Sequence, residues 1–212
     1  MTKQAVTDDW YRYEKLAVQE GFCTVCGIDE AGRGPLAGPV FAAAVILPAG
    51  CTIKGINDSK KLSPKKREAL FDEIEAGAVS YGIGFATEEE IDEINILQAT
   101  FRAMKRAFDA LKILPDLALV DGNRMPTLGV ETRTIVRGDA LSASIAAASI
   151  LAKVSRDRLM RQVDEIYPQY GFAKHKGYGT AYHVEMLKKY GPCPVHRRTF
   201  LKKILGDVVA DG

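Results

Sequence analysis

The chain has 212 residues, of which 47% are hydrophobic, a size that suits one domain, residues 1–212, around a single sizeable core. No apolar run approaches the roughly 20 residues that span a bilayer, and the N-terminus has no hydrophobic secretion segment, which argues against membrane and exported proteins. Four cysteines do not suggest a disulfide scaffold, and the net charge of +2 says little until it is divided along the chain. We therefore expect a cytoplasmic protein.

The first part of the chain predicts one helix and two strands. Residues 8–20 have the spacing of a short amphipathic helix. Residues 23–29 and 39–47 are apolar enough to be buried strands, and a loop rich in glycine connects them.

The middle of the chain predicts a helix, a strand and a long helix. Ser63 followed by Pro64 is a helix start, because serine caps the first turn and proline suits its first position, and this helix is expected to end near residue 75. Residues 79–86 alternate as a third strand of an antiparallel meander would. A capping box at residues 87–90 begins a helix to residue 112, with a break near Asn95.

The last part predicts strands at residues 117–120 and 132–136, followed by a long helix over residues 140–166. A loop with Pro168 and several glycines then leads to two final helices, residues 181–189 and 197–205. Three consecutive strands followed by strands alternating with helices predict an α/β fold, with a mixed five-stranded sheet flanked by helices.

Basic residues are concentrated in two segments. Residues 172–203 hold eight lysines and arginines and one acid, Glu185, and residues 54–67 hold six basic residues and one acid, Asp58. This distribution favours a polyanionic partner, although charge considered alone is explained better by a solvated basic face on an ordinary protein.

Acidic residues stand at the ends of three predicted strands: Asp29 and Glu30, Asp121, and Asp139. Acids at one edge of a sheet can converge, and carboxylates without histidine or cysteine select a hard cation such as Mg²⁺ or Mn²⁺. Each acid has a simpler explanation: Asp121 in a turn, Asp139 as a helix cap, and Glu30 as a solvated loop residue. Asp29 is harder to explain in this way, because it closes an apolar strand.

The loop Gly32-Arg33-Gly34 follows the first acids directly. Flanking glycines let a backbone approach a ligand closely, and exposed amides can bond hydroxyl or phosphate oxygens. A tight structural turn is the competing interpretation, since the loop lacks the features of the common phosphate-binding motifs.

Several blocks together resemble the ribonuclease HII family. The strongest is GIDEAGRGPLAGPV at residues 27–40, which matches the family's motif almost without departure. Further blocks match in order: NDSKKL (57–62), VDGN (120–123), GD (138–139) with SAS (142–144), ASILAK (148–153) and KHKGYGT (174–180). The match covers roughly residues 25–200. It implies a ribonuclease H-like fold with a helical C-terminal, substrate-binding part at about residues 180–212.

The resemblance also implies an activity. The enzyme would hydrolyse the RNA strand of RNA–DNA hybrids and cut 5′ of single ribonucleotides in duplex DNA, leaving 3′-hydroxyl and 5′-phosphate ends. The acidic quartet would be Asp29, Glu30, Asp121 and Asp139, holding two Mg²⁺ or Mn²⁺ ions, with Asp29 bridging them.

Substrate contacts are implied as well. The backbone of Gly32, Arg33 and Gly34 would recognise the ribonucleotide 2′-hydroxyl, and Tyr178 would stack on the next sugar; the alternative for Tyr178 is a loop aromatic that seals the core edge. Candidate phosphate ligands are less specific, because a helix lysine is usually only solvated. They are Lys60, Lys61, Ser142, Ser144, Lys153, Lys174 and Lys176.

Other residues that carry reactive side chains are not expected to act. Cys23 and Cys26 resemble a redox or zinc pair, but on a strand they would point to opposite faces, and no second pair completes a zinc site. The three histidines, His175, His183 and His196, are too dispersed along the sequence to be obvious metal ligands; one could act near the scissile phosphate, but surface roles are expected for them.

Three rival functions stay open. Ribonuclease HIII shares the core but usually has an extra N-terminal domain, for which the roughly 25 residues before the first strand leave no room. A silent hybrid-binding module is disfavoured, because four carboxylates without metals would repel phosphate. A general nuclease of the same fold would not need a 2′-hydroxyl. We expect a monomer.

Overall fold

The computed structural model describes residues 10–51, 53, 55, 56 and 62–206, and these contain a five-stranded mixed sheet with strand order β3-β2-β1-β4-β5. Antiparallel pairing joins β1 to β2 and β2 to β3, and parallel pairing joins β1 to β4 and β4 to β5. The strands are β1 (Val25–Ala31), β2 (Val40–Ile46), β3 (Ser80–Ala86), β4 (Leu117–Asp121) and β5 (Glu131–Ile135). The predicted mixed sheet is confirmed.

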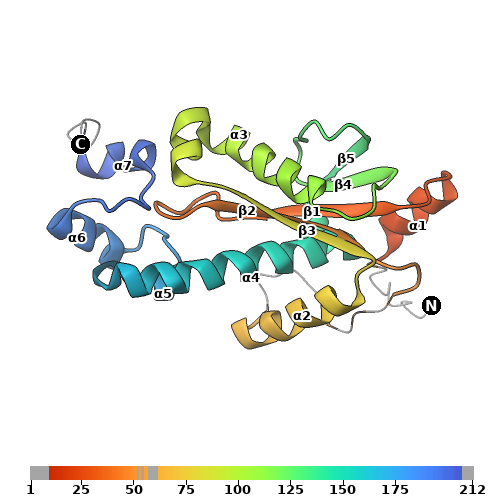
Figure 1. Ribbon diagram of the computed structural model, residues 1–212, viewed down its shortest axis with the longest axis horizontal. Helices are drawn as coiled ribbons and strands as arrows, with labels where there is room; N and C mark the ends of the chain where they lie inside the picture. Colours follow the sequence, from red (N-terminus) through yellow and green to blue (C-terminus); the bar gives the residue numbers. More distant parts are fainter. Residues whose placement is uncertain (1–9, 52, 54, 57–61, 207–212) are drawn as a thin grey trace, which may run out of the picture.

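Helices cover both faces of the sheet. Helix α3 (Glu88–Asp109) lies on one face, and α4 (Ala143–Ile166), together with α2 (Pro64–Gly77), lies on the other (Figure 1). Apolar residues of β2 point alternately to the two sides, with Ala42 and Ala44 toward α3 and Ala43 and Val45 toward α4. The core is therefore two layers, one on each side of the sheet.

Small residues allow these helices to pack closely on the strands. A Cβ atom added at Gly27 of β1 would lie 2.2 Å from the backbone of Ser144 and Ile145, at the start of α4. Such an approach excludes any side chain at position 27, so α4 begins directly over β1. This contact brings the turn before α4 close to the end of β1.

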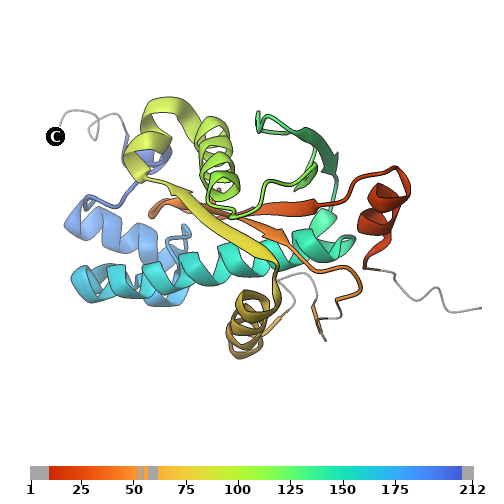
Figure 2. The ribbon, with the colours of Figure 1, turned by 45° about the vertical axis from the view of Figure 1, so that its right-hand side comes forward.

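The remaining helices lie at the two ends of the sheet. Helix α1 (Arg12–Gln19) is at one end, and the C-terminal helices are at the other, in both views (Figures 1 and 2). The C-terminal helices surround a separate apolar cluster that includes Met160, Tyr170, Phe172 and Leu201. They are α5 (Phe172–His175), α6 (Ala181–Tyr190) and α7 (Arg198–Leu205).

Most sequence-based element predictions agree with the structure, including the break at Asn95, where φ is 68°. Residues 168–179 were expected to be a loop, but two short helical segments occur there, η3 (Pro168–Tyr170) and α5. Their Tyr170 and Phe172 side chains are buried in the C-terminal cluster, and this packing holds the turns. Among the described residues, none of the helices is both long and apolar enough to cross a membrane.

Candidate active site

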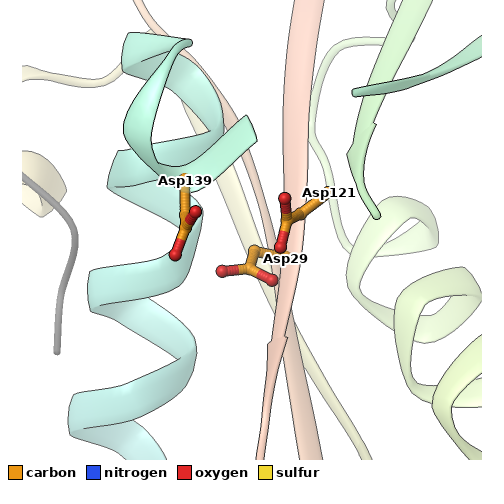
Figure 3. Close-up of side chains that lie close together, drawn as sticks. All are labelled: Asp29, Asp121 and Asp139. Atoms are coloured by element: carbon orange, nitrogen blue, oxygen red, sulfur yellow. The ribbon is translucent and has the colours of Figure 1, made fainter. Parts of the chain in front are cut away.

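Three of the four predicted acids meet at one edge of the sheet. Asp29 lies in β1, Asp121 ends the parallel neighbour β4, and Asp139 lies in η2 (Gly138–Ala140), the turn before α4. One carboxylate oxygen from each aspartate lies within 4.8 Å of those of the other two, and the side chains point toward one another (Figure 3). Parallel pairing of β1 and β4 is what places Asp29 beside Asp121.

Burial makes this cluster electrostatically costly. Asp29 is 4% exposed and Asp139 is 6% exposed. Burial raises the pKa of Asp29 well above its ordinary value, and the carboxylates of Glu30 and Asp121 raise it further, against an opposing hydrogen bond from Ser149. Clustered carboxylate oxygens without nitrogen or sulfur donors fit a hard divalent cation, which would offset this repulsion.

A glycine fixes the turn that carries Asp139. The Gly138 N–H donates to Asp121 Oδ1 at 2.6 Å, so β4 and the turn are joined by a direct hydrogen bond. A Cβ atom at position 138 would lie 2.6 Å from Cδ1 of Ile145 and 3.3 Å from the Asp121 oxygen. Position 138 must therefore be small for the two aspartates to approach.

Glu30, the fourth acid, lies beside the three aspartates. It is half-buried, its Oε1 is 3.4 Å from Nη1 of Arg33, and it lines a cavity of about 540 Å³ with Asp121, Asn123 and Arg124. Two of the four acids, Glu30 and Asp121, thus line this open cavity together with Arg33.

The glycine loop and Tyr178 line a second, smaller cavity next to the acids. Its volume is about 210 Å³, and Gly32, Arg33, Gly34, Glu30 and Tyr178 contribute to its walls. A Cβ atom at Gly34 would lie 3.6 Å from the Tyr178 ring. Segments distant in the sequence therefore form one recess, in which Tyr178 is 47% exposed.

Arg197, a buried arginine, holds the glycine loop. The sequence had placed it only in a basic segment. Arg197 is fully buried and donates to the carbonyl oxygens of Gly32 at 2.6 Å, Arg33 at 2.8 Å and Gly38 at 2.6 and 2.9 Å. Since C=O and the following N–H point in opposite directions in a trans peptide, the N–H groups of Arg33 and Gly34 point away from Arg197. Arg197 therefore sets the direction of the loop amides.

A second buried arginine, Arg156 of α4, joins this region to the Tyr178 loop. It donates to the carbonyls of Ala37 at 3.0 Å, Pro39 at 2.9 Å and Lys176 at 2.9 Å. A Cβ atom at Gly32 would lie 2.0 Å from Arg156 Nε, so the glycine is needed for the guanidinium to pack there.

The sequence does contain a sign of Arg156. Ala148, Ala152, Arg156 and Met160 are spaced four residues apart and form one buried stripe of α4. A charged residue at position 156 therefore interrupts an otherwise apolar helix face. Arg197 has no comparable sign, because it stands beside Arg198 in an ordinary basic pair. Burial, and secondarily Arg156, lower the pKa of Arg197 to about 9, which leaves it protonated near neutral pH.

Three predicted phosphate ligands share a further cavity of about 430 Å³ with Tyr178: Lys153, Lys174 and Lys176. Lys153 forms an ion pair with Asp157 at 2.6 Å, and burial lowers the pKa of Lys176. Lys60 and Lys61 lie outside the described residues. This cavity adjoins the glycine-loop recess, because Lys153 and Tyr178 line both.

The expectation for Ser142 and Ser144 needs correction. Both are buried, and both hydroxyls lie 2.6 Å from Oε1 of Glu14 in α1. Ser142 also caps α4 by accepting from Ile145 N–H at 3.3 Å. Their hydrogen-bonding groups are engaged in joining α1 to α4, so this structure gives them no path to a phosphate.

The surface role expected for the histidines is also wrong for two of them. His183 is 0% exposed and His196 is 2% exposed, and their Nε2 atoms are 3.0 Å apart. Cys23 precedes β1 and is exposed, whereas Cys26 is buried within it, and both are free thiols.

The family model described as Ribonuclease HII matches residues 26–203. This chain belongs to the ribonuclease HII family. The ribonuclease HII of Caldicellulosiruptor saccharolyticus is 52% identical over 203 residues, which are 96% of this chain and 99% of that protein. That of Acetivibrio thermocellus is 57% identical over 193 residues, or 91% of this chain and 75% of that protein. Membership makes the chain an endoribonuclease, a hydrolase that cuts phosphodiester bonds.

A solved structure agrees in fold with this ribonuclease HII chain. The ribonuclease H2 of Pyrococcus horikoshii superposes with a TM-score of 0.72 at 28% identity, covering 90% of this chain and 100% of that one. The predicted ribonuclease H-like fold is confirmed.

Proposed function

We propose that this ribonuclease HII hydrolyses the RNA strand of RNA–DNA hybrids and cuts 5′ of single ribonucleotides embedded in duplex DNA. The observation that carries the proposal is the contact between two features: a convergent acid cluster and, beside it, a recess lined by the glycine loop and Tyr178. The first suits phosphodiester hydrolysis, and the second suits recognition of a sugar next to the bond that is cut.

Asp29, Asp121 and Asp139 would bind Mg²⁺ or Mn²⁺, with Glu30 as the fourth acidic ligand. We propose two ions per site. When bound, such ions would supply an activated water and charge neutralisation at the phosphate. The rigid position of the aspartates follows from β1–β4 pairing and from the Gly138 hydrogen bond to Asp121. Hydrolysis in this arrangement would leave 3′-hydroxyl and 5′-phosphate ends.

Sugar recognition would come from the loop amides and Tyr178. The amides of Arg33 and Gly34 face away from Arg197, which leaves them able to donate to a 2′-hydroxyl. The 2′-hydroxyl distinguishes RNA from DNA at a given position, so this contact would select a ribonucleotide. The half-exposed Tyr178 ring would stack on the next sugar, which is deoxyribose at an embedded ribonucleotide.

Backbone phosphates would be bound by lysines of the adjoining cavity, Lys153, Lys174 and Lys176. Lys60 and Lys61 keep the same proposed role on sequence grounds. Phosphate contacts of this kind fix register without reading sequence, so binding should weaken steeply as salt rises. We also propose that the enzyme acts as a cytoplasmic monomer, which light scattering at several protein concentrations would test for the oligomeric state.

The test uses a labelled DNA duplex with one ribonucleotide and an all-DNA control of the same sequence, each with Mg²⁺, with Mn²⁺ and with chelator. Metal-dependent cutting on the 5′ side of the ribonucleotide, with the control intact, is the expected result. Binding without cutting would instead support a silent module, and cutting of both duplexes would mean a general nuclease. Asp72→Asn, an acid on α2 with a 75% exposed side chain, serves as the control for substitutions in the acid cluster.

A further inference from the structure

Three histidines that have no place in the acid cluster lie together behind the Tyr178 loop. His175 is in α5, His183 is in α6, and His196 lies in the segment before α7. The rings of His175 and His183 stack with centroids 4.5 Å apart, and those of His183 and His196 are 5.2 Å apart. They pack against Phe172 and Tyr170 in the C-terminal apolar cluster, so their polar atoms must find partners there.

The partners of His183 fix where its proton lies. Its Nδ1 is 2.9 Å from the Tyr178 carbonyl oxygen, which can only accept, so Nδ1 carries the hydrogen. In a neutral ring, Nε2 is then an acceptor. Nε2 of His196 lies 3.0 Å from it and must be the donor.

The partners of His196 independently require the same direction. Its Nδ1 is 2.9 Å from the backbone N–H of Cys193, which can only donate, so Nδ1 accepts and Nε2 carries the hydrogen. The Cys193 carbonyl oxygen is 3.2 Å from the same nitrogen, a longer contact than the 2.9 Å to the Cys193 N–H. In a neutral ring, Nδ1 cannot donate to this carbonyl while it accepts from the Cys193 N–H. The Cys193 Sγ, at 3.2 Å, adds a second possible donor.

Both ends therefore agree on a one-way chain of hydrogen bonds. It runs from the Cys193 N–H to His196, from His196 to His183, and from His183 to the carbonyl of Tyr178. Burial lowers the pKa of His183, and burial followed by the charge of His183 lowers the pKa of His196 to about 4, so both rings are neutral near pH 7. Among the described residues, the side chains grouped closely enough to hold one metal ion are the three aspartates of the acid cluster, and this histidine pair is not such a group.

The chain of hydrogen bonds ends at Tyr178, the residue that faces the glycine loop. The Tyr178 carbonyl accepts from His183 and from Thr180 N–H at 2.8 Å, and the preceding Gly177 N–H donates to His175 Nδ1 at 3.2 Å. The backbone on both sides of the Tyr178 side chain is thus held by imidazoles. A carbonyl that lost the His183 bond would be left to a single partner, and the peptide that orients the ring would gain freedom.

We propose that His183 and His196 are positioning residues that orient Tyr178 through this chain and so set the preference of the enzyme for a single ribonucleotide in DNA over a continuous RNA–DNA hybrid. The inference rests on the proposed function, because it assumes that Tyr178 contacts the sugar beside the cut. His196 neighbours Arg197, which holds the glycine loop, so one short segment supports both sides of the recess.

A first experiment needs neither substrate nor metal. Long-range ¹H–¹⁵N spectra of the full chain with ¹⁵N-labelled histidine, at pH 7, report which ring nitrogen carries the hydrogen. We expect the Nδ1–H form for His183, which is the minor form in free imidazole, and the Nε2–H form for His196. An Nε2–H or doubly protonated His183 would overturn the chain, whatever the enzyme cuts.

A second experiment compares two substitutions at one position. The side-chain amide of Asn superposes on Nδ1 of histidine, and that of Gln reaches toward Nε2, so His183→Asn keeps the donor to Tyr178 and His183→Gln keeps the contact with His196. We expect His183→Gln to lower the ratio of single-ribonucleotide to hybrid cutting by about 2- to 10-fold, the worth of one hydrogen bond. His183→Asn should keep the ratio within about twofold, and melting temperatures of both variants control for general destabilisation.

A double-mutant cycle shows whether His183 acts through Tyr178. In a Tyr178→Ala background, His183→Gln should have no further effect on the ratio, because the residue it positions is gone. An undiminished effect in that background, or equal effects of the Asn and Gln substitutions, would refute the positioning role. A wild-type enzyme that cuts neither substrate would refute the proposed function instead. The histidine spectra would still show whether the chain of hydrogen bonds through His196 and His183 exists.

Discussion

Replacing Arg197 with lysine should loosen the glycine loop while conserving charge. The guanidinium of Arg197 makes four hydrogen bonds to three carbonyls, those of Gly32, Arg33 and Gly38. An ammonium group cannot span this fork, and each lost bond from a charged donor is worth about 1.5–3 kcal/mol. With part of the contact recovered by lysine, we expect a loss of about 3 kcal/mol in unfolding free energy, or roughly 6–12 °C in melting temperature for a chain of this size.

The assay combines thermal unfolding with cutting kinetics on the single-ribonucleotide duplex. Arg198→Lys is the matched control, since Arg198 is the adjacent, exposed arginine. We expect kcat/KM to fall for Arg197→Lys, because the amides of Arg33 and Gly34 lose their fixed direction, with little change for Arg198→Lys. A melting temperature within about 2 °C of the control would refute the argument that buried guanidinium bonds hold the loop.

Three further outcomes are expected. Asp29→Asn should abolish cutting, measured on the same duplex, but retain binding by fluorescence anisotropy, and it should raise the melting temperature of the metal-free protein by removing a buried like charge. Gly32→Ala should unfold at lower temperature and lose activity, since its Cβ would meet Arg156 at 2.0 Å and φ there is +98°. The pKa of His196 in the folded protein, about 4, is below its ordinary 6.5. As the pH falls, the unfolded chain therefore takes up a proton on this residue before the folded protein does. The free energy of unfolding should drop by up to about 1.4 kcal/mol per pH unit between pH 6.5 and 4. Urea midpoints at pH 7 and 5 measure this, and His196→Gln should flatten the difference.

The secondary-structure elements and the clustering of Asp29, Asp121 and Asp139 were predictable because their signals are local or follow from strand pairing. Alternation, caps and apolar runs indicated each strand and long helix, and acids at the ends of three predicted strands indicated convergence. In the structure Asp121 ends β4, whereas Asp29 lies within β1 and Asp139 lies in η2. The match of ordered motifs indicated the family before any geometry was known.

The sequence by itself determined the sheet, the family and the aspartates Asp29, Asp121 and Asp139, whereas the tertiary structure alone decided what supports the recess around them. Arg197, His196 and His183 act on backbone carbonyls and on one another across the fold. A carbonyl is the same at every residue, so no side-chain pattern marks the one that a distant arginine or imidazole will reach. Ser142 and Ser144 were misassigned for the same reason, since only the packing of α1 on α4 brings Glu14 to their hydroxyls.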